Sequence, residues 1–223
     1  EKKSVDEIIK LFNFYKLRSK IDFIDVSKKY VASIISLEKF REINSADPAL
    51  GKTINYIDDL VYIDPRNSKL GAKIISKLEN LHLTIKKLNL KISDKEKYYN
   101  KSFELGIPQT NLGKLKDKIF GIENNLDELN GIDFKKGCYV GQENTSRIKL
   151  RNKLRRRILP IKKITGEISE NDIIMYKNYE IGKVMINKPF CYALIKVVDP
   201  DLKEFNNIEL TCGKSKVKIL KPD

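Results

Sequence analysis

The sequence predicts two parts, a region of mixed helices and strands followed by a region made only of short strands. Up to about residue 152, segments with apolar residues at helical spacing alternate with short β-branched runs. Beyond that point, short strand-like runs are separated by Gly, Pro, Asn and Asp, a spacing typical of a small antiparallel barrel or sandwich. We therefore place one domain at 1–152 and a second at 153–223.

Capping residues mark the helices expected in the first region. Two Ser residues are each followed three positions later by Glu, the spacing of a capping box, and they predict helix starts at Ser4 with Glu7 and at Ser93 with Glu96. The second of these helices is expected over 94–105 and ends at Gly106. A third helix is predicted over 140–151, after a loop that recurring Gly residues mark from 107 to 137.

Strands are expected where β-branched and aromatic residues cluster. In the first region the predicted strands are 20–26, 30–36 and 60–66. In the second region the predicted strands lie in "LRRRILPI", "EIGKVMI", "FCYALIKVV", "NIEL" and "SKVKIL".

Composition limits the class of protein. Of the 223 residues, 41% are hydrophobic and 33% are charged, so the chain can bury a core. No run of about 18 apolar residues is present, and the N-terminal residues lack the apolar region of a signal peptide, so we expect neither a membrane span nor export. The three Cys form no C-x-x-C pair and there is one His, which argues against a disulfide framework and a closed zinc site.

The segment "KKGCYVGQENTSRIKLR" (135–151) carries the main candidate residues. Gly137 before Cys138 suits a tight turn, and a helix that begins just after Cys138 would favour a thiolate there through its free N–H groups. The alternative is that Cys138 is a small buried apolar residue. Glu143, Arg147 and Arg151 follow at intervals of four residues and share one helix face.

The charged helix face also has two interpretations. An exposed ladder of ion pairs is the favoured one from these residues alone. A ligand-facing strip is the other: a carboxylate can accept two hydrogen bonds from the amide and amine edge of a pterin or guanine, and guanidinium groups suit carboxylates or phosphates. Tyr139 can stack on a flat ligand or pack, whereas Glu104 and Glu123, each isolated, are expected to be solvated, and His82 to be packed or on the surface.

The net charge of +14 has its densest cluster at 149–157, "KLRNKLRRR". Such a run can bind RNA, but it contains no aromatic residue for base stacking. A solvated basic surface is the favoured interpretation, so direct nucleic-acid binding is not expected. Cys191 and Cys212 lie in strand patterns and are expected to be core or edge thiols.

The segment "KKGCYVGQENTSR" resembles the K-G-C-Y-x-G-Q-E signature of the YgfZ-type proteins, relatives of the glycine-cleavage aminomethyltransferase. Further similarity lies in "LFNFYKLRSKIDFIDVS", "FELGIPQ", "IENNLDELNGIDFKKGC" and the strand runs of the second region, so nearly the whole chain is covered. The resemblance implies an α+β folate-binding domain of ferredoxin-like pieces, followed by a small antiparallel β-barrel. Family members carry a further sheet-forming segment before the position of Ser4, so we expect only part of the folate domain here.

The resemblance implies binding of tetrahydrofolate and a role in assembly or repair of [4Fe–4S] clusters, including those of enzymes that modify tRNA. Cys138 matches the signature cysteine and is the expected functional thiol. The expected folate-binding residues are Glu143, Arg147, Tyr139, Glu123 and Gln142. Partners would be client enzymes or assembly proteins, without a membrane, in a bacterial cytoplasm or a mitochondrial matrix.

Two alternatives stay open: an aminomethyltransferase of glycine cleavage and a basic RNA-binding module. The transferase needs a carboxylate to position the reacting amine, and the sequence shows no obvious one. We therefore do not expect a conventional enzyme. The family often has Arg four residues before the Gly of "GIP", where this chain has Ser102, which removes one potential anchor for an anionic ligand.

Overall fold

The computed structural model describes residues 4–45, 49–137, 141–151, 154–197, 205 and 208–221. The chain divides into two compact units, one formed by 1–64 with 71–91 and the other by 65–70 with 92–223. The domain boundary after residue 152 stays a prediction, and the all-strand region forms part of the second unit. Within the described residues, no helix is long and apolar enough to cross a membrane.

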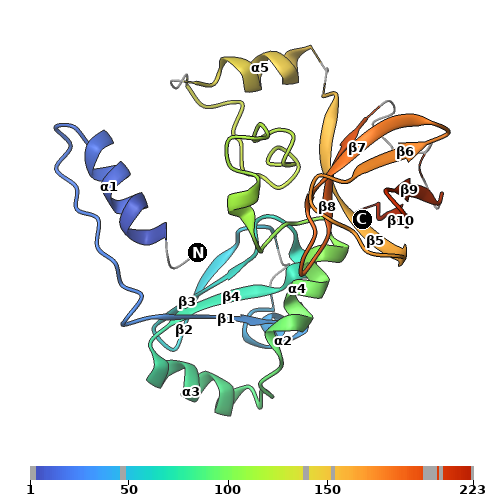
Figure 1. The fold of residues 1–223 in the computed structure, drawn as a ribbon. Coiled ribbons are helices and arrows are strands. Elements are labelled where there is room, and N and C mark those ends of the chain that lie inside the picture. Colours follow the sequence, from blue (N-terminus) through green and yellow to red (C-terminus); the bar gives the residue numbers. More distant parts are fainter. Residues whose placement is uncertain are drawn as a thin grey trace. The chain divides into compact units, whose positions relative to one another are not determined.

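The first unit is built around a four-stranded antiparallel sheet in the order β1-β4-β3-β2 (Figure 1). Its elements are α1 (Val5–Tyr15), β1 (Val31–Ile35), α2 (Leu37–Ile43), β2 (Thr53–Tyr56), β3 (Asp59–Ile63), β4 (Ala72–Ser76) and α3 (Leu78–Lys87). In β3 and β4, alternate residues are buried, as expected when one face of a sheet packs on a core. Phe40 of α2 packs into that core and is fully buried.

A glycine is required where the chain enters β4. Gly71 has φ +86°, and a Cβ at this position would lie 2.2 Å from the carbonyl oxygen of Ile35. Both the backbone conformation and the close approach of β1 therefore exclude other side chains.

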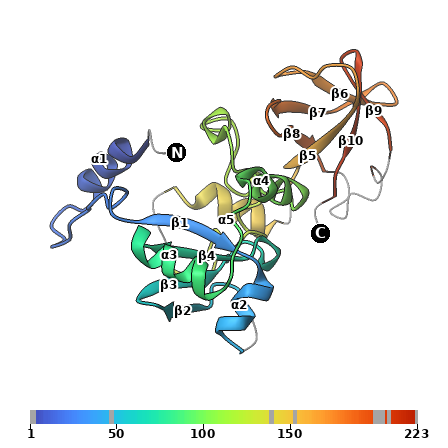
Figure 2. The same ribbon diagram turned by 90° about the horizontal axis from the view of Figure 1, so that it is seen from below.

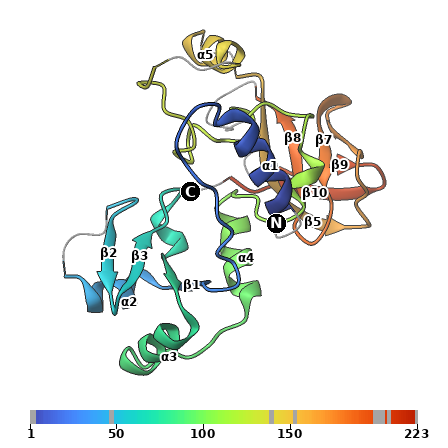
Figure 3. The ribbon, with the colours of Figure 1, turned by 90° about the vertical axis from the view of Figure 1, so that its left-hand side faces the viewer.

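Two predictions for the first unit are wrong in detail. Residues 20–26 form no strand, and Ile21 and Ile24 are exposed by 47% and 78%. Strand propensity reflects packing on a neighbouring strand, and no described strand pairs with this segment, which runs between α1 and β1 (Figure 3). Helix α1 begins where predicted, but the Ser4 side chain makes no capping hydrogen bond.

The second unit contains a closed antiparallel barrel in the order β10-β5-β8-β7-β6-β9 (Figure 2). The strands are β5 (Arg156–Thr165), β6 (Ile173–Tyr176), β7 (Tyr179–Ile186), β8 (Tyr192–Lys196), β9 (Leu210–Cys212) and β10 (Ser215–Ile219). The structure thus confirms the α+β class with a small β-barrel. Gly182 lets two strands approach closely, because a Cβ there would lie 2.7 Å from the carbonyl oxygen of Leu194.

Before the barrel, the second unit contains η2 (Ser68–Leu70), α4 (Lys95–Glu104), η3 (Leu112–Lys114) and α5 (Glu143–Leu150). Helix α4 packs on the barrel through Phe103, whose ring centroid lies 5.4 Å from those of Phe190 and Tyr192. Its N-cap is Asp94, which accepts a hydrogen bond from the Glu96 N–H at 2.9 Å, so the predicted cap at the preceding Ser is wrong by one residue.

Candidate functional site

The signature segment leads into helix α5. Cys138 and Tyr139, the predicted functional thiol and stacking residue, lie outside the described residues. Gln142 is the N-cap of α5 and is half-buried, and Glu143 is the first helical residue. The predicted helix over 140–151 is confirmed as Glu143–Leu150, a shorter element.

The two main predicted folate contacts are exposed on α5. Glu143 and Arg147 stand one turn apart, and neither side chain forms an ion pair or hydrogen bond within the described residues. The predicted ladder of ion pairs along this face is therefore not formed there. Both groups are available to a ligand, and a carboxylate and a guanidinium suit the polar edge and anionic tail of a folate.

Glu123 is held by the protein rather than solvated. Its residue exposure is 5%; one carboxylate oxygen accepts from the Phe120 N–H at 3.0 Å and the other from Arg156 Nε at 2.8 Å. The expectation of a solvated side chain is wrong here, although it holds for Glu104, which is exposed. That Glu123 contacts a cofactor stays a prediction, and the contact would have to share an oxygen already in use.

The loop that contains Glu123 fixes the start of the barrel. Asn125 donates to the carbonyl oxygen of Ile158 at 2.9 Å and accepts from Arg157 Nε at 2.9 Å. Arg157 also forms an ion pair with Glu128 at 3.0 Å. Because these contacts join residues about 30 positions apart, they tie the loop to β5.

The same loop supplies carboxylate partners to three cations of the basic run at 149–157. Lys149 forms an ion pair with Asp127, and the neighbouring carboxylate raises the pKa of the Lys149 ammonium. Arg156 and Arg157 have acidic partners as described above. Intramolecular pairing of these cations disfavours the run as a continuous RNA-binding surface.

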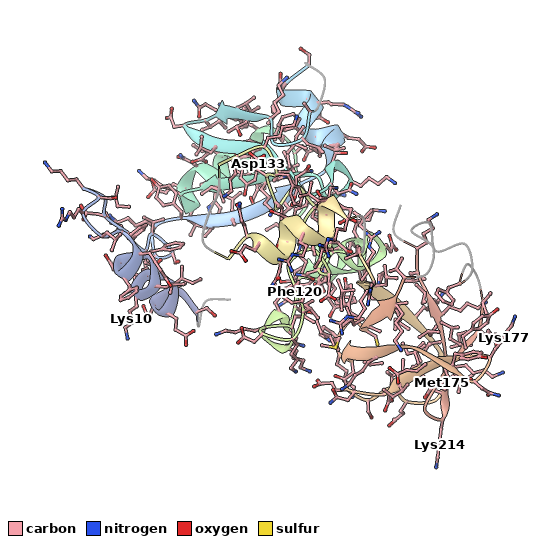
Figure 4. The ribbon with its side chains drawn as sticks, turned by 90° about the horizontal axis from the view of Figure 1, so that it is seen from above. Lys10, Phe120, Asp133, Met175, Lys177 and Lys214 are labelled. Atoms are coloured by element: carbon pink, nitrogen blue, oxygen red, sulfur yellow. The ribbon has the colours of Figure 1, made fainter. Side chains whose placement is uncertain are left out.

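Glu123 and Arg147 both line a groove of about 630 Å³ in the second unit. The volume lies in the range of small-molecule sites. Phe120, labelled in Figure 4, lines the groove and is 46% exposed. The groove therefore brings two of the predicted site residues together with an aromatic side chain.

The remaining candidates of the sequence lie elsewhere. His82 is exposed on α3, which confirms the surface interpretation. Cys191 and Cys212, the barrel thiols, are both buried in the barrel core, and burial raises the pKa of each, to about 12 and about 11.

Ser102 is 1% exposed and its hydroxyl donates to the Ile107 carbonyl at 2.7 Å, so this position is internal. Among the described residues, no three His, Cys, Asp or Glu side chains gather as metal ligands.

Comparison with known proteins finds relatives that are similar to this chain in sequence. No family model matches the chain. A mitochondrial iron–sulfur cluster assembly factor (IBA57 homolog) of Dictyostelium discoideum is 34% identical over 149 residues, 66% of this chain and 36% of the relative. Its counterpart in Neurospora crassa is 30% identical over 151 residues, 66% of this chain and 33% of the relative. The mouse protein is 29% identical over 99 residues, 44% of this chain and 27% of the relative.

The helices and antiparallel sheet of the first unit and the closed barrel of the second define an α+β protein with a small antiparallel β-barrel, and the signature segment precedes that barrel in the chain. The chain is a homologue of these assembly factors, which belong to the YgfZ-type folate-binding family. It spans about a third of the length of the curated relatives it matches.

Proposed function

We propose that the protein acts in iron–sulfur cluster assembly, with a reduced folate as its cofactor and Cys138 as its functional thiol. The observation that carries the proposal is the similarity to relatives named as iron–sulfur cluster assembly factors, combined with the intact K-G-C-Y-x-G-Q-E segment. The names of these relatives also place them in mitochondria, and we propose the mitochondrial matrix for this protein.

The proposed folate contacts begin at α5. Glu143 would accept two hydrogen bonds from the pterin edge, since its carboxylate is exposed and has no described partner. Arg147, one turn further along, would face the anionic part of the same ligand. Gln142 and Tyr139 would complete the contacts from the start of the helix, and Glu123 would orient Arg156 at the edge of the groove.

Cys138 would act as a transient ligand. A thiolate can donate one bond to an iron of a cluster in transit, whereas a cluster usually takes four such ligands. The others would come from a client enzyme, an assembly protein or small thiols. The barrel thiols do not suit this role, because both are buried and their raised pKa keeps them protonated.

Titration with tetrahydrofolate tests the cofactor. Wild type is expected to bind saturably, and Glu143→Ala to bind at least about tenfold more weakly, the loss expected for hydrogen bonds to a charged group. Glu104→Ala is the matched control, because this exposed carboxylate belongs to α4. Equal affinities of wild type and Glu143→Ala would refute the pterin contact.

Complementation tests the thiol. In cells from which the protein has been deleted, expression of the Cys138→Ser variant is expected to leave the activity of [4Fe–4S] enzymes low. Expression of a folded Cys191→Ser variant is expected to restore that activity. Full activity with Cys138→Ser would contradict the proposed role of the thiol. If expression of the protein restores glycine cleavage in cells that lack the aminomethyltransferase, a transferase activity is favoured instead.

A further inference from the structure

A set of cations gathers at the groove beside α5, which we call the arginine groove. Its lining consists of Phe120, Glu123, Arg147, Ile148, Arg151, Leu154, Arg155, Arg156 and Lys196. Five of these side chains are cationic and one is acidic. The acidic one, Glu123, is already engaged by Arg156 and by the Phe120 N–H, so the lining offers no further carboxylate to its other cations.

Three of those cations have no partner among the described residues. The side chains of Arg147, Arg151 and Arg155 are exposed and form no ion pair or hydrogen bond there. Arg147 and Arg151 also stand four residues apart around α5, a spacing at which like charges repel. Lys196 differs, because it forms an ion pair with the Glu180 carboxylate at 3.6 Å and also donates to the Glu180 carbonyl oxygen at 3.0 Å.

The contrast with their neighbours in the chain is informative. Lys149, Arg156 and Arg157 belong to the same basic run, and each has a carboxylate partner from the 120–130 loop. The protein therefore supplies acids for these cations and leaves Arg151 and Arg155 unneutralised at the groove. The negative end of the α5 dipole favours a cation at Arg151, but it does not account for Arg155, which lies beyond the helix.

The groove also has an apolar wall. Phe120 is 46% exposed, and Ile148 and Leu154 line the same space. A ligand that fits this surface has an apolar or aromatic part and a multiply charged anionic part. A guanidinium fork binds carboxylates and phosphates in the same bidentate manner, so both anions match the chemistry of the groove.

We propose that the arginine groove binds a small molecule that carries at least two negative charges, held by Arg151 and Arg155. The anion has two chemical sources, the glutamate tail of a bound folate or a separate phosphate-bearing molecule. Only the first source rests on the proposed function, and the groove itself does not require it.

The test compares the wild-type chain with the double variant Arg151→Gln/Arg155→Gln. The matched control is Lys162→Gln/Lys218→Gln, which removes the same charge from two residues paired across β5 and β10. Calorimetric titrations use tetrahydrofolate with one glutamate, tetrahydrofolate with three γ-linked glutamates, and inorganic pyrophosphate. Circular dichroism confirms the fold of each variant, and Arg155→Gln alone replaces the double variant should that one unfold.

Two results support the proposal. If the tail is the source, the triglutamate binds about tenfold or more tightly than the monoglutamate, and the arginine variant loses this gain while the lysine variant keeps it. If the source is a separate phosphate compound, pyrophosphate binds without folate, and the arginine variant weakens it at least about tenfold. The proposal is overturned if the arginine variant behaves like the lysine variant with every anion.

The two proposals fail separately. If wild type does not bind the monoglutamate, folate binding is refuted, but pyrophosphate binding that depends on the arginines would still support the groove proposal. Monoglutamate binding that depends on Glu143, with no effect of the arginines on any anion, would support the folate site and refute the groove.

Discussion

Replacement of Glu123 by Gln tests whether this carboxylate holds the second unit together. Gln has the same shape but one acceptor oxygen, so it can serve the Phe120 N–H or Arg156 Nε and not both. The Glu123 side chain is 7% exposed, so the Gln N–H group that replaces the second oxygen faces a donor, lacks an acceptor and has little access to water. We expect the free energy of unfolding to fall by about 2 kcal/mol, since a buried unsatisfied donor costs about 1–3 kcal/mol.

The Glu123–Arg156 ion pair contributes less to the free energy of unfolding than the burial of Glu123 alone suggests. The Arg156 side chain is 45% exposed, so solvent screens its charge and we discount the Coulomb contribution. A change of about 2 kcal/mol lowers the Tm of a unit of this size by roughly 5–10 °C. Thermal and urea unfolding followed by circular dichroism measure both quantities.

Glu128→Gln is the matched control in the same loop. Glu128 pairs with Arg157 at 3.0 Å, but its carboxylate side chain is 44% exposed, so the expected loss is below about 1 kcal/mol. An equal or smaller destabilisation by Glu123→Gln than by Glu128→Gln would refute the reasoning. Unchanged stability with weakened folate binding would instead assign Glu123 to the ligand.

Three further predictions concern the barrel and α4. Gly182→Ala is expected to destabilise by about 2 kcal/mol, because the new methyl group would meet a backbone carbonyl at 2.7 Å, whereas Gly113→Ala, with no atom within 4 Å, should leave the Tm nearly unchanged. Burial raises the pKa of the barrel thiols above that of the same thiols in the unfolded chain. Because the unfolded thiols ionise first, the free energy of unfolding should fall as pH rises above about 9 toward 11. Urea midpoints at pH 8 and pH 10 test this, with a variant that has both thiols replaced by Ala as the control. Asp94→Ala should lower the free energy of unfolding by about 1 kcal/mol and Ser93→Ala should hardly change it, as measured by thermal unfolding. The reverse order would show that Ser93 is the N-cap.

Much of the fold follows from local patterns in the sequence. Helix α1 could be predicted from apolar residues at helical spacing, and helix α4 from a capping-box pattern and the Gly that ends it. Strands β1 and β3 and most barrel strands could be predicted from clusters of β-branched and aromatic residues. The short helix α2, the helix α3 and the strands β2, β4 and β6 were not predicted. Strands β2 and β6 have four residues each, which is too few to establish a repeat.

The candidate site divides in a similar way. Helical spacing placed Glu143 and Arg147 on one face of α5, and both are exposed there. The role of Glu123 was not foreseen, since its partner Arg156 is 33 positions away and no local pattern encodes such a contact. Pairing of Lys149 with Asp127 was missed for the same reason, so the basic run appeared more available than it is.

Helix α5 has no buried residue, although it carries the signature glutamate. Its attachments include an ion pair and a cation–π contact of Lys149, whose ammonium lies 5.4 Å from the Phe134 ring centroid. Exposed ion pairs weaken as mobile ions shorten the Debye length, from about 10 Å at 0.1 M salt to about 3 Å at 1 M, whereas a packed barrel does not depend on that length. Added salt should therefore loosen the attachment of α5 well before it affects the barrel. Ionic strength then changes the geometry of the site while the barrel stays folded, whereas heat and denaturant act on both.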